Sequence, residues 1–199
     1  MYPVVKRAFD LFIILITAPL WLPLMGSLAL WVKISSPGPV FFRQKRYGKD
    51  RRFFMILKFR SMYVDAPRDV PTHLLTDPAQ FITPVGKWLR RTSLDELPQV
   101  INILRGDISL VGPRPALWNQ DDLMDERDKY GANNIPVGLT GLAQISGRDE
   151  LSIEEKATFD GQYARDMGFW LDLKILWRTF IQAISGKGVQ EGGPSAKSK

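Results

Sequence analysis

The sequence of 199 residues contains no cysteine and a single histidine, His73. The absence of cysteine excludes disulfides, thiolate catalysis and cysteine-based metal sites. His73 lies in a polar stretch rich in proline and threonine, where a lone histidine is usually solvated. Chemistry in this chain is therefore expected to use carboxylates, lysines and arginines, with a hard metal ion as a further option.

The sequence also has no internal repeat and no nucleic-acid-binding motif, and its aromatic residues are not spaced as base-stacking platforms. The net charge of +6 and the pI near 9.6 nevertheless indicate an anionic partner. With 24% charged and 45% hydrophobic residues, the chain has the composition of a folded protein. An anionic lipid or a phosphorylated substrate is therefore favoured, and no nucleic acid is expected.

No charged residue occurs from Leu11 to Val32, and about 20 apolar helical residues suffice to cross a bilayer. Pro19 and Pro23 lie near the middle of this run and disfavour a continuous helix. Basic residues flank both ends, which favours placing both ends on the cytoplasmic side. A signal peptide fits poorly because its apolar core is shorter and ends at a small-residue cleavage site. The residues alone leave a kinked span and a re-entrant helix–break–helix about equally supported.

A β-hairpin is predicted after the turn cluster Ser35–Pro39, with strands Val40–Phe42 and Phe53–Met62 and a turn at Tyr47–Asp50. Basic residues are concentrated here, either as a solvated edge or as a surface held against anionic headgroups. In the second interpretation, Lys58 and Arg60 face a phosphate. The basic residues concerned are Arg43, Lys45, Arg46, Arg51, Arg52, Lys58 and Arg60.

Amphipathic helices are predicted in three further places. The segment Phe81–Leu89 has apolar residues at helical spacing with basic flanks, which suits a membrane interface or an ordinary protein core equally well. A helix from Ser152 to Arg165 opens with the capping-box pattern Ser-x-x-Glu. The apolar side of a final helix is formed by Leu173, Leu176, Trp177, Phe180 and Ile184.

Two adjacent acids, Asp95 and Glu96, lie at a predicted helix start within the pattern Ser93-Leu94-Asp95-Glu96. The favoured interpretation of this pattern is a capping box, in which Glu96 bonds back to the cap and Asp95 complements the helix dipole. The same placement would keep an acid ionised, the state that a carboxylate nucleophile or an Mg²⁺ ligand requires. The segment continues to Arg114, which has a proline on each side.

Two other patterns carry weaker signals. The segment Gly138–Arg148 has three glycines and a terminal arginine, which could let a backbone approach a phosphate, but it lacks the Gly-Lys-Ser/Thr end of a P-loop. The acidic stretch Asp121–Asp128 is interleaved with Arg127 and followed by Lys129. This second stretch is therefore predicted to be a solvated helix face and not a metal cluster.

Taken in order, these motifs resemble the bacterial sugar transferases, also called monotopic phosphoglycosyl transferases, and most closely their small single-module members. The resemblance runs from Lys6 to about Gly192. The segments that carry it are Lys6–Asp10, Pro37–Gln44, Lys58–Met62, Ser93–Gln99, Gly106–Pro115 and Gly138–Arg148.

The resemblance and the patterns above predict an α+β fold that is mostly helical, with a small β-hairpin near the active site and interfacial amphipathic helices. Residues 1–35 would form a re-entrant membrane hairpin, residues 36–186 a catalytic domain, and residues 187–199 a mobile tail. The family's membrane helix is broken at a proline, usually Ser-Pro, which favours re-entry, with the break here at Ala18-Pro19. Alanine offers no hydroxyl for a freed carbonyl.

The resemblance implies transfer of a sugar-1-phosphate from a UDP-sugar to undecaprenyl phosphate, at the cytoplasmic face of the bacterial inner membrane, with anionic lipids nearby. Asp95 would attack the sugar-bearing phosphorus and displace UMP, and Glu96 would hold Mg²⁺. The implied phosphate-binding residues are Lys58, Arg60, Arg90, Arg114 and Arg148. The family often has Arg-Pro before its glycine loop, where this chain has Pro136-Val137.

An alternative from another class is a non-catalytic, membrane-docked scaffold or binding module. Its basic edge and apolar hairpin would hold a partner enzyme at the membrane. The sequence is compatible with a homo-oligomer. It does not distinguish one sugar or one glycan pathway from another.

Overall fold

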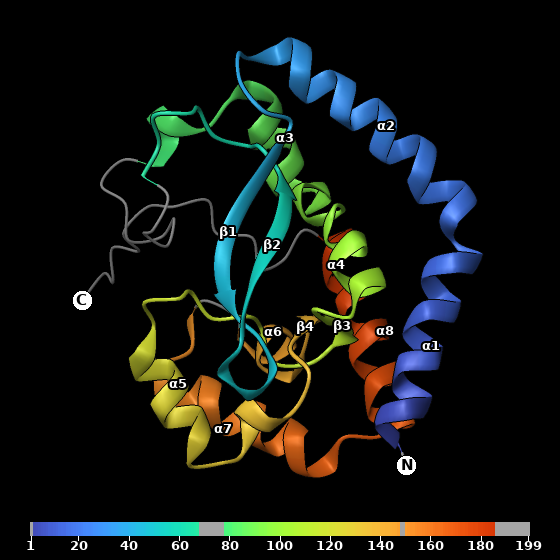
Figure 1. Cartoon of the computed structure of the whole chain (residues 1–199), viewed down its shortest axis with the longest axis vertical. Helices are drawn as coiled ribbons and strands as arrows, with labels where there is room; N and C mark the ends of the chain where they lie inside the picture. Colours follow the sequence, from blue (N-terminus) through green and yellow to red (C-terminus); the bar gives the residue numbers. More distant parts are fainter. Residues whose placement is uncertain (1, 68–77, 148–149, 186–199) are drawn as a thin grey trace.

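The computed structural model describes residues 2–67, 78–147 and 150–185, and its architecture is mostly helical with two small sheets (Figure 1). The helices are α1 (Tyr2–Ile16), α2 (Ala18–Ser35), α3 (Pro84–Arg91), α4 (Gln99–Arg105), α5 (Asp121–Asp128), α6 (Leu142–Ser146), α7 (Ile153–Asp166) and α8 (Phe169–Ser185). The strands are β1 (Phe41–Tyr47), β2 (Phe53–Phe59), β3 (Ser109–Val111) and β4 (Gly138–Thr140). Single turns of 3₁₀ helix are η1 (Lys49–Arg51), η3 (Pro78–Phe81), η4 (Leu94–Glu96) and η5 (Ala132–Asn134).

The predicted β-hairpin is confirmed. Strands β1 and β2 pair antiparallel, with Phe41 opposite Phe59 and Tyr47 opposite Phe53. The turn η1 joins them, with Asp50 in the left-handed region at φ 54°. Strand β2 ends at Phe59, before the predicted Met62. Burial does not follow a simple alternation: Arg43, Lys45, Phe53 and Met55 are exposed, whereas Tyr47, Leu57 and Phe59 on the same face are buried.

Strands β3 and β4 form a parallel pair in which Ser109 lies opposite Gly138 and Val111 opposite Thr140. A Cβ atom added at Gly138 would lie 2.1 Å from the backbone nitrogen of Gly112, and one added at Gly141 would lie 2.2 Å from the Gly112 carbonyl oxygen. These two glycines of the predicted phosphate loop therefore permit two backbone segments to approach each other closely.

The break in the apolar run lies at Thr17, between α1 and α2 and next to the predicted Ala18-Pro19. The Thr17 hydroxyl donates to the Ile13 carbonyl at 2.6 Å, and the Trp21 indole N–H donates to the Ile14 carbonyl at 2.8 Å. The hydroxyl that Ala18 cannot supply is therefore provided by the residue before it. Figure 1 shows α1 and α2 as an open arc along one side of the molecule.

Helix α2 is the one helix in the described ranges that is long and apolar enough, by length and composition, to cross a membrane. On one side it packs against α3: Val85 and Leu89 are buried with Val32, and the rings of Trp31 and Trp88 lie 5.2 Å apart. The core interpretation of the Phe81–Leu89 segment is therefore correct for this face. The helix itself begins at Pro84.

Helix α1 is fixed to the rest of the molecule by its charged residues. Lys6 pairs with Asp172 of α8, and both side chains are 2% exposed. Arg7 donates to the Leu104 carbonyl at the C-terminal end of α4, at 3.0 Å. Asp10 accepts from the Ser109 hydroxyl of β3 at 2.6 Å. Three polar contacts thus dock α1 onto α8, α4 and β3.

The capping box predicted at Ser152 is confirmed, because the Ser152 hydroxyl accepts from the Glu155 N–H and the Glu155 carboxylate accepts from the Ser152 N–H. The acids of α5 at Asp121, Asp122, Asp125 and Asp128 are exposed, as predicted for a solvated helix face. Arg51 of the hairpin turn pairs with Asp125 and Asp128. The predicted tail, residues 187–199, lies outside the described residues.

Candidate active site

The adjacent acids Asp95 and Glu96 lie in the short turn η4, between α3 and α4. The predicted capping box is wrong. Ser93 adopts the left-handed conformation with φ 57°, and its side chain makes no cap hydrogen bond. The Glu96 carboxylate turns away from the backbone, and its Oε1 accepts from Lys58 Nζ and from Arg114 Nη2, each at 2.7 Å. Two charge-assisted bonds outweigh the single backbone bond of a capping box.

The long helix expected to start at Ser93 begins only at Gln99, after Pro98. Asp95 therefore does not lie in the first turn of a multi-turn helix, and its protonation depends on its neighbours. Burial raises the pKa of Asp95, and Lys58, whose Nζ lies 3.9 Å from Asp95 Oδ2, acts against that shift. The prediction that the helix start keeps Asp95 ionised is therefore corrected: the nearby cations favour the charged form.

Glu96 behaves differently from its neighbour. Burial alone would raise its pKa, but the charges of Arg114 and Lys58 and their hydrogen bonds outweigh burial and hold the pKa well below its usual range. The two adjacent carboxyl groups thus have pKa values shifted in opposite directions. Such a separation is typical of functional sites, where paired acids take different roles.

Three of the predicted phosphate-binding residues surround these acids. Lys58 comes from β2, Arg114 from the loop after β3, and Arg90 from the last turn of α3. The Arg90 Nε donates to the Ser61 hydroxyl at 2.9 Å, and its charge opposes the rise in the pKa of Asp95, as that of Lys58 does. Arg148, the remaining predicted cation of the glycine segment, lies outside the described residues.

Arg60 does not belong to this group, which corrects its predicted role. Its side chain is buried, and the guanidinium donates to the Pro37 carbonyl at 2.8 Å and to the Ser36 carbonyl at 2.6 Å, where α2 ends. Because β2 stops at Phe59, Arg60 no longer shares a strand face with Lys58. Gly38, with φ 125°, leaves the space that this guanidinium fills. Arg60 therefore caps the C-terminal end of α2.

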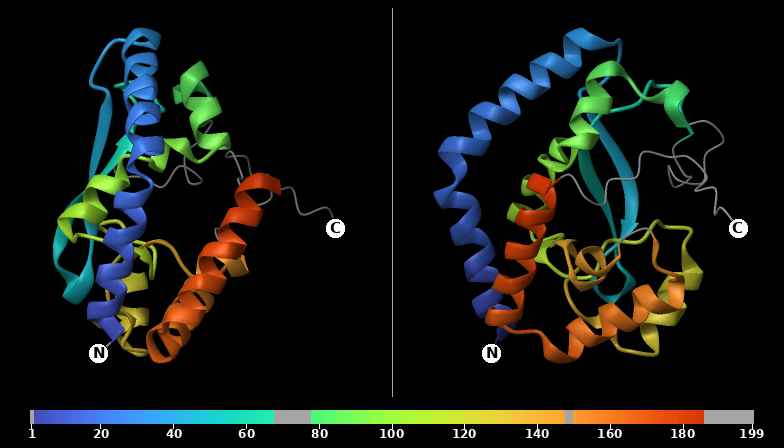
Figure 2. Two further views of the ribbon diagram at one scale, coloured as in Figure 1. Left: turned by 90° about the vertical axis from the view of Figure 1, so that its right-hand side faces the viewer. Right: turned by 180° about the vertical axis from the view of Figure 1, so that it is seen from behind.

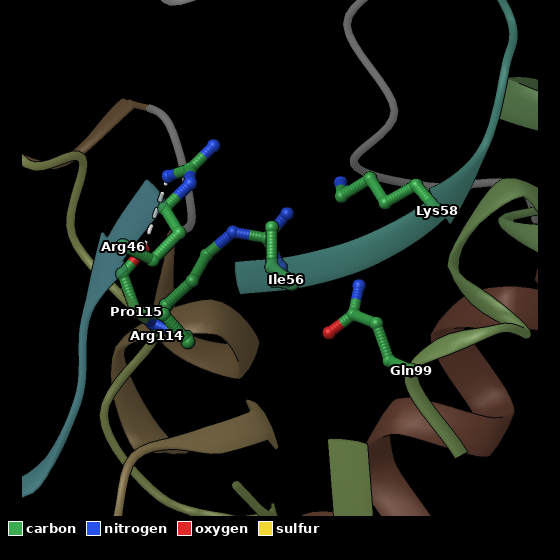
Figure 3. A pocket seen from close by; sticks show the side chains of 6 residues that line it. All are labelled: Arg46, Ile56, Lys58, Gln99, Arg114 and Pro115. Atoms are coloured by element: carbon green, nitrogen blue, oxygen red, sulfur yellow. Dashed lines mark hydrogen bonds between the residues drawn. The ribbon is translucent and has the colours of Figure 1, made fainter. Parts of the chain in front are cut away.

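A pocket lies beside the acidic pair and is drawn in Figure 3. Its lining contains two residues that the sequence did not single out for substrate binding, Arg46 of β1 and Gln99 of α4. The alternation of the hairpin is the signal that could have identified Arg46, because it places Arg46, Ile56 and Lys58 on one face. The full lining is Arg46, Ile56, Lys58, Gln99, Arg114 and Pro115.

Arg46 is held in place from two sides. Its Nε and Nη2 donate to the Gln44 side-chain oxygen at 3.1 and 2.6 Å, and its Nη1 donates to the Pro115 carbonyl at 3.1 Å. Burial and the positive charge of Arg114 lower the pKa of Arg46 to about 10. The hairpin and the proline-flanked arginine loop are thereby joined at the pocket.

The backbone of Arg114 is fixed by a buried ion pair behind the loop. Arg127 of α5 donates to the Arg114 carbonyl at 2.9 Å and pairs with Asp160 of α7 at 2.6 Å. The side chains of Arg127 and Asp160 are 4% and 1% exposed. Arg127, which the sequence placed on a solvated face, therefore positions the loop that carries Arg114.

The described residues contain no group of three or more His, Asp or Glu side chains that could hold a metal ion. Mg²⁺ commonly takes only one or two carboxylates, with substrate phosphates and waters completing its shell. Glu96 uses Oε1 for Lys58 and Arg114, and its second oxygen makes no hydrogen bond to the described residues. The acidic pair therefore fits an Mg²⁺ ion that arrives with a phosphorylated substrate.

Comparisons with known proteins identify the family of this chain. The family model described as bacterial sugar transferase matches residues 1–186. Over 189 residues the chain is 41% identical to the UDP-glucose:undecaprenyl-phosphate glucose-1-phosphate transferase of Escherichia coli K12, covering 92% of this chain and 40% of that protein. Over 193 residues it is 38% identical to the uncharacterized sugar transferase EpsL of Bacillus subtilis, covering 94% and 91%.

A third relative acts on a different sugar. Over 200 residues the chain is 36% identical to the UDP-N-acetylgalactosamine-undecaprenyl-phosphate N-acetylgalactosaminephosphotransferase of Aeromonas hydrophila, covering 96% of this chain and 46% of that protein. The chain thus spans less than half the length of the Escherichia and Aeromonas relatives and nearly all of the Bacillus one.

Proposed function

We propose that this chain, which belongs to the bacterial sugar transferase family, transfers a sugar-1-phosphate from a UDP-sugar to undecaprenyl phosphate. The names of the Escherichia and Aeromonas relatives support both substrates. The observation that carries the proposal is the placement of Asp95, a buried carboxyl group, beside Lys58, Arg90 and Glu96. A carboxylate among cations suits attack on a phosphorus atom whose oxygens those cations neutralise.

The reaction proceeds in two displacements. A carboxylate oxygen of Asp95 forms a bond to the sugar-bearing phosphorus, the bond from that phosphorus to the UMP oxygen breaks, and UMP leaves with the electron pair. A phosphate oxygen of undecaprenyl phosphate then attacks the same phosphorus, and the Asp95 carboxylate is released unchanged. Two steps let a soluble and a lipid substrate use one carboxylate in turn.

The remaining residues prepare this chemistry. Lys58, Arg90, Arg114 and Arg148 bind phosphate oxygens, and Glu96 would hold Mg²⁺. A bound Mg²⁺ offsets negative charge on the diphosphate. Burial removes water from Asp95, which makes its ionised form a stronger nucleophile, while Lys58 favours that ionised form.

A panel of UDP-sugars tests the proposal. Continuous UMP release is expected with at least one sugar, and only when undecaprenyl phosphate and Mg²⁺ are both present. The assay measures UMP from the full chain in micelles, with reactions lacking the lipid or the metal as controls. A folded protein that releases no UMP with any sugar would favour the scaffold alternative.

We propose that this site lies at a membrane and that α1 and α2 enter and leave the same face of it. Many of their large apolar side chains are exposed, Val4 at 76%, Leu20 at 74% and Ile34 at 73% among them. Helix α8 meets α1 near the N-terminus and then diverges from it (Figure 2, left), and it exposes Trp170 and Trp177. Thr17 and Trp21 satisfy the carbonyls at the break, as a lipid environment requires.

Cysteine labelling tests this topology, and the chain's lack of cysteine gives a clean background. Pro3 and Ser35 are exposed residues in the first turn of α1 and at the end of α2, and each is replaced by cysteine in a separate variant. With a membrane-impermeant maleimide, both are expected to react only after the inner membrane is opened. The unsubstituted chain is the control. Reaction of one position in intact spheroplasts and of the other only after lysis would reject re-entry.

A further inference from the structure

We infer that the pocket between the β-hairpin and α4 is a phosphate-oxygen subsite in which Gln99 and Arg46 are substrate-binding residues, alongside Lys58 and Arg114. This inference rests on the proposed function, because it takes the occupant to be a phosphate group of one of the two substrates. It extends the binding set to a neutral amide donor and to a cation of the hairpin.

The Gln99 side chain carries the first observation. Gln99 is 2% exposed, and its Nε2 has no hydrogen-bond partner among the described residues. Buried donors in folded proteins are normally paired, since an unpaired one forfeits its bonds to water. Figure 3 shows the Gln99 amide nitrogen directed into the pocket, toward Lys58 and Ile56. The amide is therefore placed as a donor for a ligand.

A neighbouring residue shows that this arrangement is particular to Gln99. Asn102, one turn further along α4, is fully buried against the same strand. Its side chain donates to the Met55 carbonyl at 2.9 Å and accepts from the Leu57 N–H at 2.9 Å. Of the two buried amides on α4, Asn102 is thus hydrogen-bonded to β2, whereas the Nε2 of Gln99, next to the acidic pair, has no partner among the described residues.

Arg46 carries the second observation. Its three hydrogen bonds, to Gln44 and Pro115, go to neutral oxygens, and no salt bridge joins it to a carboxylate in the described part of the chain. A guanidinium has five N–H donors, so two are left for another acceptor. Glu96, the carboxylate whose charge acts on the pKa of Arg46, is bonded to Lys58 and Arg114. The pocket therefore carries excess positive charge.

The lining identifies the chemical class of the occupant. Its side chains offer an ammonium, two guanidinium groups and an amide N–H, and no carboxylate is among them. Such a set repels a metal ion and suits an anion with several acceptor oxygens, because donors from β1, β2, α4 and the Arg114 loop approach from different directions. A phosphate group has this geometry and charge.

The test measures the binding of inorganic phosphate to the full chain in micelles. Phosphate binding is detected by the shift that it causes in the midpoint of thermal unfolding. Gln99→Leu is expected to raise the unfolding midpoint without ligand, because an unpaired buried amide is removed, and to weaken phosphate binding roughly fivefold or more. Arg46→Gln is expected to weaken binding by at least as much. Arg43→Gln, which removes the same charge from the exposed face of β1, is the matched control and should stay within about twofold of wild type.

The assignment of Gln99 as a substrate-binding residue would be overturned by one result. In that result, Gln99→Leu binds phosphate within about twofold of wild type and has a lowered unfolding midpoint, which would show that Gln99 is structural. If the leucine variant does not fold, Gln99→Glu keeps the side-chain shape and should abolish phosphate binding by presenting a carboxylate to the anion. The KM values of the Gln99 and Arg46 variants identify which substrate supplies the phosphate group. A selective rise in the KM for the UDP-sugar indicates the diphosphate of the donor, and a selective rise in the KM for undecaprenyl phosphate indicates the phosphate of the acceptor.

The outcomes separate this inference from the proposed function, because phosphate binding needs no turnover. A wild-type chain that binds phosphate through Gln99 and Arg46 but releases no UMP would contradict the proposed function alone. A wild-type chain that releases UMP while both variants bind phosphate normally would contradict the inference alone.

Discussion

Replacement of Asp95 by asparagine is expected to lower UMP release by roughly 10³-fold or more, because the amide keeps the shape of the side chain but cannot attack phosphorus. Lys58, which faces both acids, would lose one of its two anionic neighbours and keep Glu96. The measurement is the initial rate of UMP release at saturating UDP-sugar, undecaprenyl phosphate and Mg²⁺. An Asp95→Asn variant with near wild-type rate would exclude Asp95 as the nucleophile.

The stability of the same variant distinguishes catalysis from scaffolding. Burial raises the pKa of Asp95, so the folded protein holds the charged form at a cost, and a neutral isostere should leave the free energy of unfolding unchanged or higher. If Asp95 served only to complement the helix dipole, Asp95→Asn would instead lower the free energy of unfolding by roughly 0.3–1 kcal/mol. Urea denaturation in micelles measures this difference. Asp122→Asn, which neutralises an exposed acid in the first turn of α5, is the control: activity should be unchanged, and the loss of stability should be of this helix-dipole size.

Replacement of Glu96 by glutamine is expected to reduce both stability and activity. Lys58 and Arg114 would lose their shared anion, and breaking a buried ion pair from one side leaves uncompensated charge. Since the Arg114 side chain is 40% exposed, solvent screens part of this cost, and we expect a loss of about 1–3 kcal/mol. UMP release should fall roughly 10²-fold, because the phosphate-binding cations are no longer aligned.

The pH dependence of unfolding gives an independent check on Glu96. Its folded pKa lies below the unfolded value of 4.5, so its stabilising contribution is present above pH 4.5 and is lost as the pH falls toward the folded pKa. Asp95 acts in the opposite sense: its raised pKa favours the folded state at low pH, and that contribution is lost as the pH rises through the folded pKa. The difference in stability between wild type and Glu96→Gln should therefore shrink below pH 4.5.

Two features make this comparison specific. Measurements with a chelator present remove any contribution from bound Mg²⁺. Glu126→Gln, which breaks the surface pair with the 64%-exposed Lys129, is the matched control, and it should cost no more than about 0.5 kcal/mol. A wild-type chain whose stability advantage over Glu96→Gln does not change below pH 4.5 would contradict the assigned shift in the pKa of Glu96.

Several elements could be predicted because their causes are local. Prolines break the apolar run near Ala18, turn residues close the hairpin, and Ser152 with Glu155 opens α7. Each pattern involves residues within a few positions of one another, so the backbone preferences act whatever the rest of the chain does. The predicted boundaries are less accurate: β2 ends at Phe59 and not at Met62, and α4 begins at Gln99 and not near Ser93.

The parts of the site that were mispredicted depend on partners distant in the sequence. Glu96 has the local spacing of a capping box, but Lys58 and Arg114 come from other elements and take its carboxylate. Arg60 has the spacing of a phosphate ligand, but the end of α2 takes its guanidinium. Strong long-range bonds override weak local preferences, because a charged group in a buried site must find the best partners available.

The sequence alone indicated the candidate acids and most of the candidate cations. The pattern around Asp95 and Glu96, with Lys58, Arg90 and Arg114, was recognisable from its residues and order. The tertiary structure decided how these groups are used: which acid is held ionised, how Arg114 is fixed by Arg127, and which further residues, Arg46 and Gln99, face the pocket. Residue type fixes what a side chain can do, whereas burial and neighbouring charge, which set its pKa and its free donors, arise only when the chain has folded.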